Sequence, residues 1–241
     1  MQNTLLRWLL TALILVAMLL LTRLLPFSYF FRTLDTMIHE FGHAAATLVL
    51  SGSVLAIELN ANHSGVTYSL IEPGWRSLLV TLTGYFTASL FAVLLFWLFA
   101  RRRERSGLIG MTVLAVLMLL LFVHEGYGLV WLIGFSVVNL AVLLLGRFVR
   151  SFYFLLLAFI TLEESVLAPL SLLLLAWTDP ARAGDASSLA RMTWLPAWLW
   201  ALFFLLGALV CARYALRYFM QRLTTRSRES AYPTYYERGG V

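Results

Sequence analysis

The stretch from Phe31 to Leu50, FRTLDTMIHEFGHAAATLVL, places an H-E-x-x-H motif inside an apolar run long enough to span a bilayer. Positions four apart lie on one face of a helix, so His39 and His43 can hold one metal ion between them. Glu40 follows His39 directly and is close enough to take a proton from a water that the metal activates. The stretch therefore predicts a membrane helix that carries a metal site.

Ionisable residues inside apolar runs are candidates for function, because each costs about 2.5–3.5 kcal/mol at the bilayer centre on insertion scales. Asp35 lies one turn before His39 on the same face, and we expect its carboxylate to orient an imidazole. Glu163 and Glu164 lie near the middle of a later apolar run, residues 152–177. At least one of them is expected to meet a metal, a proton or a buried partner.

The composition indicates a polytopic membrane protein. Of the 241 residues, 61% are hydrophobic and only 12% are charged, and the mean hydropathy is +0.84. The net charge of +6 does not indicate nucleic-acid binding, because the arginines that carry it lie between and after the apolar runs. The single cysteine, Cys211, excludes an intramolecular disulfide.

The fold predicted from these runs is an all-α polytopic membrane protein with about seven transmembrane helices and one small β-hairpin after the second. Residues 1–216 are expected to form a single transmembrane metalloprotease-like domain, and residues 217–241 a polar, Arg-rich tail. The predicted spans are residues 5–25, 31–50, 75–100, 108–123, 127–145, 152–177 and 194–215.

Two connections between the spans have a distinct character. Residues 53–70 alternate β-branched and aromatic residues with smaller or polar ones around an Asn60–Gly65 turn, which predicts a β-hairpin. A polar connection near residue 185 contains Gly184-Asp185-Ala186 ahead of an apolar periodicity, which is typical of a helix N-terminus with Asp185 as its N-cap.

The arginines predict an orientation. The cluster at 101–105, Arg147 with Arg150, the carboxyl-terminal tail and the connection between Arg23 and Arg32 all fall on one side of the seven-span arrangement. An excess of arginine marks the cytoplasmic side. The hairpin and the connection that carries Asp185 would then lie on the other side.

Three segments together resemble the site-2 protease family of intramembrane zinc metalloproteases: HEFGHA in an early helix, SGVTYS in the strand-like segment, and LTGYFTASLF after it. The later GDASSLARMTWLPAWLWALFF is similar to a segment of a compact bacterial branch of that family, so the likeness covers most of residues 31–213. The resemblance implies a zinc ion held by His39, His43 and an Asp from a later helix, with Glu40 as general base.

The third ligand and the orientation both stay open. Better-known members of the family carry their Asp in an asparagine-proline or leucine-aspartate-glycine context that this chain lacks. Asp185 lies in the matching later segment, and Glu164 is the alternative at mid-span depth. Members of the family also place the strand segment and the zinc nearer the cytoplasm, whereas the arginine count places the hairpin on the other side.

These observations predict an intramembrane zinc metalloprotease that hydrolyses membrane-protein substrates with a water activated by zinc and Glu40. A substrate helix would unwind and pair with the 53–70 hairpin. The expected location is the inner membrane of a bacterium, with the lipid bilayer and no nucleic acid as partner. Two alternatives are a non-catalytic metal-binding scaffold or chaperone of the same fold, and a transporter that uses the 39–43 motif and Glu163-Glu164 as a cation or proton path.

Overall fold

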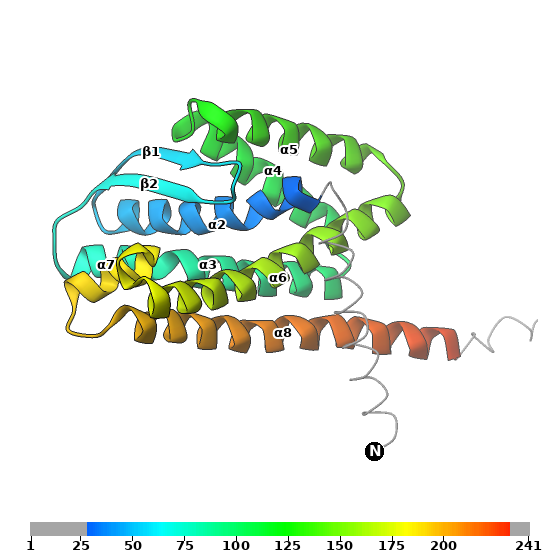
Figure 1. The fold of residues 1–241 in the computed structure, drawn as a ribbon. Helices are drawn as coiled ribbons and strands as arrows, with labels where there is room; N and C mark the ends of the chain where they lie inside the picture. Colours follow the sequence, from blue (N-terminus) through cyan, green and yellow to red (C-terminus); the bar gives the residue numbers. More distant parts are fainter. Residues whose placement is uncertain (1–27, 232–241) are drawn as a thin grey trace, which may run out of the picture.

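The computed structural model describes residues 28–231, so the first predicted span, residues 5–25, lies outside the described residues. Figure 1 shows an arrangement of helices with one short hairpin lying on them. The elements are α2 (Ser28–Val49), β1 (Ser53–Leu59), β2 (Gly65–Leu70), α3 (Trp75–Ala100), α4 (Glu104–Leu121), α5 (Gly126–Leu144), α6 (Arg147–Thr178), the 3-10 turn η1 (Pro180–Arg182), α7 (Gly184–Met192) and α8 (Ala197–Ala231).

Five of the described helices are long and apolar enough to cross a membrane, namely α3, α4, α5, α6 and α8. These helices match the last five predicted spans, and the chain is an integral, multi-pass membrane protein. The predicted second span corresponds to α2, which carries Arg32, Asp35 and Glu40 and is therefore less apolar. Leu34, Met37 and Ile38 of α2 are buried, because other elements of the protein surround this helix.

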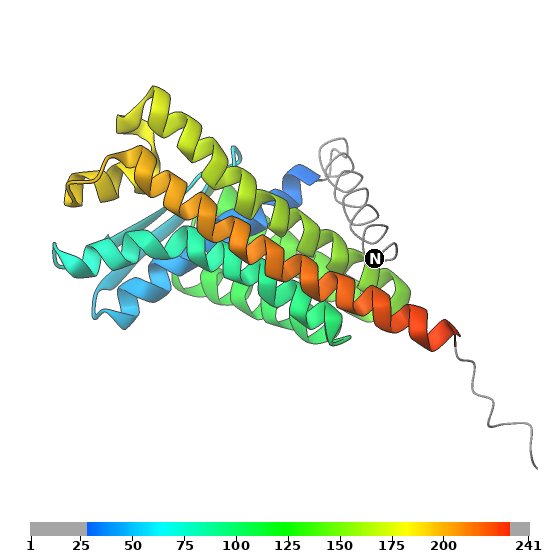
Figure 2. The same cartoon turned by 90° about the horizontal axis from the view of Figure 1, so that it is seen from below.

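Helix α3 is central to the arrangement. It packs against α2, α6 and α8, and α8 packs in turn against α6. Figures 1 and 2 show α8 running alongside α3 and α6, with α7 near the end at which α8 begins. Helices α4 and α5 form a neighbouring antiparallel pair. Helix α8 thus contacts α3, α6 and α7, and α3 is far from the other two in the sequence.

The hairpin lies along α2 and is fixed to it at both its turn and its strands. β1 and β2 pair antiparallel, with Leu59 opposite Gly65. At the turn, the Tyr29 hydroxyl donates to the Ala61 carbonyl, and the Thr36 hydroxyl donates to the His63 carbonyl at 3.0 Å. The predicted hairpin is confirmed, and these contacts hold it against the helix that carries the motif.

The last helix is longer than predicted. Helix α8 continues to Ala231, so the boundary placed at residue 216 falls inside a helix. Composition becomes polar there, but no Pro or Gly interrupts the chain before Pro233. Ala215 and Phe219 are both buried and lie one turn apart, so one face of α8 continues to pack against the protein beyond the predicted end.

The arginine-rich junctions meet at one end of the helices. Arg222 of α8 donates to Glu104 at 2.6 Å and also to the Phe99 carbonyl, and Ser151 of α6 donates to Glu104 at 3.1 Å. The ends of α3 and α8 and the starts of α4 and α6 are thereby joined. Which side of the membrane this end faces stays a prediction.

Arg32 does not belong to that end of the molecule. Helix α2 begins at Ser28, so Arg32 lies inside the helix rather than in a connection between two spans. Its guanidinium pairs with Glu164 near the middle of α6, with 2.6 Å between Nε and Oε1. A buried carboxylate at that depth needs a cationic partner, and the charge of Arg32 is used there rather than as a membrane-side anchor.

Candidate metal centre

Helix α2 presents the two imidazoles of the motif to the same point. The Nε2 atoms of His39 and His43 lie 3.0 Å apart. Nδ1 of His43 lies 2.8 Å from the carbonyl oxygen of Val80 in α3. A carbonyl can only accept, so Nδ1 carries a proton and Nε2 is the nitrogen left to bind a metal ion. This tautomer is the one that a metal ligand requires.

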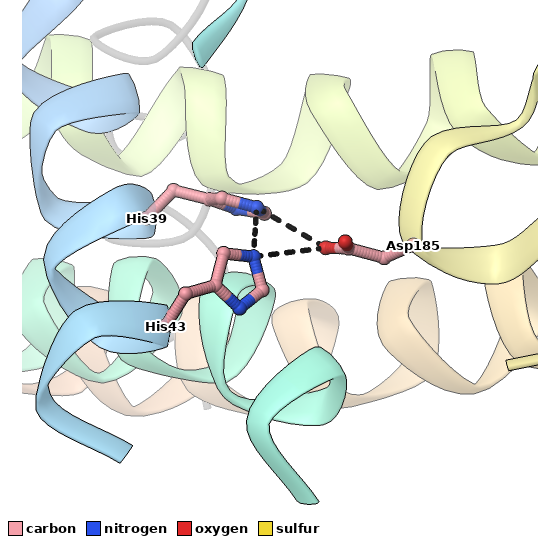
Figure 3. A group of neighbouring side chains, drawn as sticks. All are labelled: His39, His43 and Asp185. Atoms are coloured by element: carbon pink, nitrogen blue, oxygen red, sulfur yellow. Dashed lines mark hydrogen bonds and ion pairs between the residues drawn. The ribbon is translucent and has the colours of Figure 1, made fainter. Parts of the chain in front are cut away.

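Helix α7 brings a carboxylate to the two imidazoles. Asp185 Oδ2 lies 3.2 Å from His39 Nε2 and 3.3 Å from His43 Nε2. Figure 3 shows the three side chains converging, the histidines from α2 and the aspartate from the opposite side. These are the residues whose ligand atoms could hold one metal ion in the described part of the chain.

The position of Asp185 depends on the packing of a short helix. Ala186 and Leu189 of α7 are buried in a small apolar cluster that includes Phe204 of α8. Gly184, with φ of +41°, begins the helix in the left-handed region, which favours glycine. Helix α7 is thus fixed by its apolar side, and its first turn directs the carboxylate of Asp185 toward α2.

Asp185 is not an N-cap, contrary to the sequence-based expectation. The N-cap position of α7 is Ala183, which makes no capping side-chain bond, and Asp185 lies within the first turn. Burial alone would raise the pKa of its carboxyl, but the hydrogen bonds and charges of His39 and His43 outweigh burial and lower this pKa below its usual value. The carboxylate is therefore held in its ionised, ligand-competent form.

Glu164, the alternative third ligand, does not join the two imidazoles. Its carboxylate is paired with Arg32, at 2.6 Å to Nε and 3.3 Å to Nη2. One of the two adjacent glutamates, Glu164, thus meets a partly buried cation. Of the two candidates, the structure brings Asp185 to the histidines.

The spacing of the three atoms fits a small tetrahedral ion. Ligand atoms about 2.0–2.1 Å from a tetrahedral zinc ion lie about 3.3 Å from one another. The observed separations are 3.0, 3.2 and 3.3 Å. Two imidazole nitrogens and one carboxylate oxygen are also the ligand types of catalytic zinc sites.

Gly84 of α3 leaves the space next to these nitrogens open. A Cβ at this position would lie 2.5 Å from His39 Nε2 and 2.6 Å from His43 Nε2. The Thr83-Gly84-Tyr85 step thus allows α3 to approach the motif directly. Tyr85 continues the contact, with its ring edge-on to His39 at a centroid separation of 4.5 Å. The absence of a side chain at residue 84 forms a cradle beside both prospective ligands.

Strand β2 fixes the carboxylate of Glu40. The Thr67 hydroxyl donates to Glu40 Oε2 at 2.7 Å. A Cβ at Gly65 would lie 2.5 Å from Oε1, so only glycine leaves room around this second oxygen. Glu40 is 4% exposed and lines the same cavity as the two histidines. It is thus held in one orientation with one oxygen free of the Thr67 bond.

Asp35 does not orient an imidazole. Its Oδ1 is buried and has no hydrogen-bond partner among residues 28–224. No hydrogen bond joins its carboxyl group to His39 or His43 in the described part of the chain. The orienting bond to the motif comes instead from the Val80 carbonyl.

These side chains line a cavity of about 740 Å³. Its walls come from α2, β2, α3, α6 and α7 and include Gly65, Thr67 and Ser69, alternate residues of β2. The cavity is therefore bounded by the prospective metal ligands on one side and by a strand on another.

The hydrogen-bond register shows which backbone groups of β2 face away from β1. Asn60 N donates to Ser64 O at 2.9 Å, so these two residues form a hydrogen-bonded pair. Along an antiparallel ladder, hydrogen-bonded and non-bonded pairs alternate. Ile57 N donates outward, to Phe122 O, which marks the Ile57–Thr67 pair as non-bonded. The N–H and C=O of Thr67, and by alternation those of Gly65, therefore point to the edge of β2 that has no neighbouring strand within the described residues.

The sequence did not predict that Thr67 would bond to Glu40, or that Arg32 would pair with Glu164. A threonine in a strand and an arginine near the start of a helix carry no pattern that indicates their partners. Gly65 does carry a signal, because a glycine at the start of a strand often marks close approach of another group.

A multi-pass helical membrane protein with two histidines of an H-E-x-x-H motif and a distant aspartate at one point belongs, by fold and site, with membrane-embedded metallopeptidases. A family model described as Peptidase M50B-like matches residues 9–215, and the chain belongs to this family. The match confirms the resemblance to site-2 proteases. No curated protein and no solved structure matches the chain.

Proposed function

We propose that this protein is an intramembrane zinc metalloprotease that hydrolyses peptide bonds of membrane-protein substrates. The observation that carries the proposal is the convergence of His39, His43 and Asp185 at separations of 3.0–3.3 Å beside a buried Glu40. The three residues would hold the ion. When bound, zinc lowers the pKa of a coordinated water toward about 7 and polarises a carbonyl.

Glu40 is the proposed general base. Its Oε2 accepts the Thr67 hydroxyl, so Oε1 is the oxygen left to take a proton from the attacking water. The carboxylate of Glu40 fills the place that a Cβ at Gly65 would take, so glycine lets β2 lie directly against the base. The same carboxyl would then give the proton to the leaving amine. Burial of Glu40 keeps bulk water away from this proton transfer.

The edge of β2 is the proposed docking site for the substrate backbone. A transmembrane helix must unwind before hydrolysis, which exposes N–H and C=O groups that are costly in an apolar surrounding. The outward backbone groups of Gly65 and Thr67 could pair with an extended segment, as in other β-augmentation complexes. Because Thr67 also holds Glu40, such pairing would bring a substrate carbonyl close to the base.

The alternatives make different predictions about the same residues. A missing third ligand would favour a scaffold of this fold, whereas Asp185 lies beside both imidazoles. A transporter was expected to use the two glutamates of α6 in its path, whereas Glu164 is paired with Arg32. Both observations support the protease. The bacterial inner membrane stays a prediction.

The test compares Glu40→Gln with Glu58→Gln, which removes an exposed carboxylate from β1. Each detergent-purified protein is assayed for zinc by elemental analysis and, after reconstitution, for cleavage of a pool of single-span membrane proteins. We expect about one zinc per chain in both variants. We also expect Glu40→Gln to lower the cleavage rate by at least about 10²-fold, and Glu58→Gln to retain it. A His39→Ala, His43→Ala double variant should lose the zinc.

Two results would contradict the proposal. If the double variant kept its zinc, the ion would not be held by the motif. If the zinc-loaded protein cleaved no substrate, and Glu40→Gln changed no product, the scaffold would be the better reading.

A further inference from the structure

One carboxylate in the cavity has no role in the proposed chemistry. Asp35 lines the cavity and is 8% exposed, and its Oδ1 has no hydrogen-bond partner in the described part of the chain. A buried carboxyl group without a partner is destabilising, and a ligand that supplies the partner is one reason for a protein to keep it. Asp35 is therefore a candidate to contact a ligand that enters the cavity.

The charges around Asp35 define what that ligand carries. Between α2 and α6 the cavity wall holds one guanidinium, that of Arg32, and two carboxylates, those of Asp35 and Glu164. Arg32 is bonded to Glu164 through two of its nitrogens. Arg182 and Arg191, which also line the cavity, interact with Asp179 and Ser188 on the α7 side. The wall between α2 and α6 thus carries one carboxyl group, that of Asp35, whose Oδ1 has no partner among the described residues.

We propose that the space between α2 and α6 is a subsite for a lysine or arginine side chain of the substrate, with Asp35 as its anionic partner. Ala168 and Leu172 of α6 line the same cavity and would contact the methylene stem of such a side chain. The Arg32–Glu164 pair forms the wall beside the charged head. The proposal rests on the protease function above.

The position of the subsite places this side chain close to the scissile bond. Asp35 precedes His39 by four residues, which is about 6 Å along the axis. An extended chain rises about 3.3 Å per residue, so the cationic residue lies within about two residues of the bond cleaved. Arginine and lysine flank transmembrane segments at the membrane boundary. The subsite would therefore select cleavage near the end of a substrate helix rather than at its centre.

The first arm of the test measures binding without requiring activity. The probe is n-butylguanidinium, with neutral butyramide as its control, added to zinc-loaded protein in detergent. We expect the cation to raise the unfolding temperature of the wild type and of Glu58→Gln, and to have no such effect on Asp35→Asn. Butyramide should shift none of them. Equal shifts in the wild type and in Asp35→Asn would overturn the proposal.

The second arm measures specificity. A mixed peptide library is digested, and the cleaved bonds are identified by mass spectrometry. Lysine and arginine should be enriched at one position within two residues of the cut, and Asp35→Asn should reduce this preference by about 10-fold or more. The zinc content of Asp35→Asn should be unchanged, because Asp35 is not a ligand. A parallel loss of zinc would make Asp35 a support of the metal site and overturn the subsite.

The two arms separate the failure of this proposal from that of the protease function. Cleavage without a cationic preference overturns the subsite and leaves the protease standing. If no peptide is cut, but butylguanidinium stabilises the wild type and not Asp35→Asn, the cation subsite stands as a ligand site and the protease function falls.

Discussion

Two clusters of buried charge lie along α3, one near its start and one at its end, and they differ in how their atoms are satisfied. At the end, Glu104 accepts from Arg222 and Ser151, and Arg222 also lies over the Phe99 ring at 3.7 Å from the centroid. These interactions join a donor to an acceptor or a cation to an aromatic face.

Near the start of α3, the candidate metal centre brings three ligand atoms to one point instead. Nε2 of His39, Nε2 of His43 and Oδ2 of Asp185 lie 3.0–3.3 Å from one another, so protons or a metal ion must lie between them. The hydrogen bonds around Glu104 are complete within the chain and stabilise the fold. The three converging ligand atoms near the start of α3 could instead be satisfied by a bound metal ion. The following variants test this contrast.

The largest effect is expected at Asp185. Asp185→Ala removes one of three prospective ligands and should lower zinc affinity and cleavage by more than about 10²-fold, because even residues behind the ligands are worth about 10–100-fold. Elemental analysis and a cleavage assay measure both. Glu164→Gln is the matched control and should keep its zinc. Full zinc in Asp185→Ala together with loss in Glu164→Gln would reverse the assignment of the third ligand.

The satisfied cluster should respond in the opposite way. Glu104→Gln leaves the partly buried Arg222 without its carboxylate, which should cost about 1–3 kcal/mol, less than for a fully buried pair. Denaturation in detergent should show the lower stability, while zinc per folded chain stays unchanged. Loss of zinc at unchanged stability would mean that the two clusters are not separable in the way proposed.

Gly84 tests the space beside the ligands. In Gly84→Ala the new methyl group would lie within 2.6 Å of both Nε2 atoms, so the rings must shift. We expect zinc affinity to fall by about 10–100-fold. Gly110→Ala in α4, where a Cβ meets nothing within 4 Å, should bind zinc normally and be more stable by about 0.5–1 kcal/mol. Competition with a chelator compares the two, and equal affinities would remove Gly84 from the site.

The smallest effect is expected at Thr67. Thr67→Val keeps the shape of the side chain but removes the bond to Glu40, so the general base is less well oriented. We expect cleavage to slow by about 10-fold with zinc retained. Thr112→Val, which removes a hydroxyl that bonds within α4, is the control and should leave the rate unchanged. A Thr67→Val rate equal to the wild type would show that the bond does not position the base.

Much of the helical arrangement could be read from the sequence because a bilayer leaves few choices. An apolar run of spanning length forms a helix, since its backbone groups must bond internally. The predicted span at residues 75–100 matches α3, and the 53–70 hairpin has the predicted strands. The end of α8 was missed, because composition becomes polar after residue 216 while one helical face continues to pack.

The sequence by itself determined the two histidines, the adjacent glutamate and the class of site, because H-E-x-x-H places its residues by helix geometry alone. Only the tertiary structure decided between Asp185 and Glu164, which are separated from His39 by more than 120 positions in the chain. The choice depends on where α7 packs and on which carboxylate Arg32 reaches. Local periodicity fixes a residue on its own helix, whereas contacts between distant helices depend on packing that no short pattern encodes.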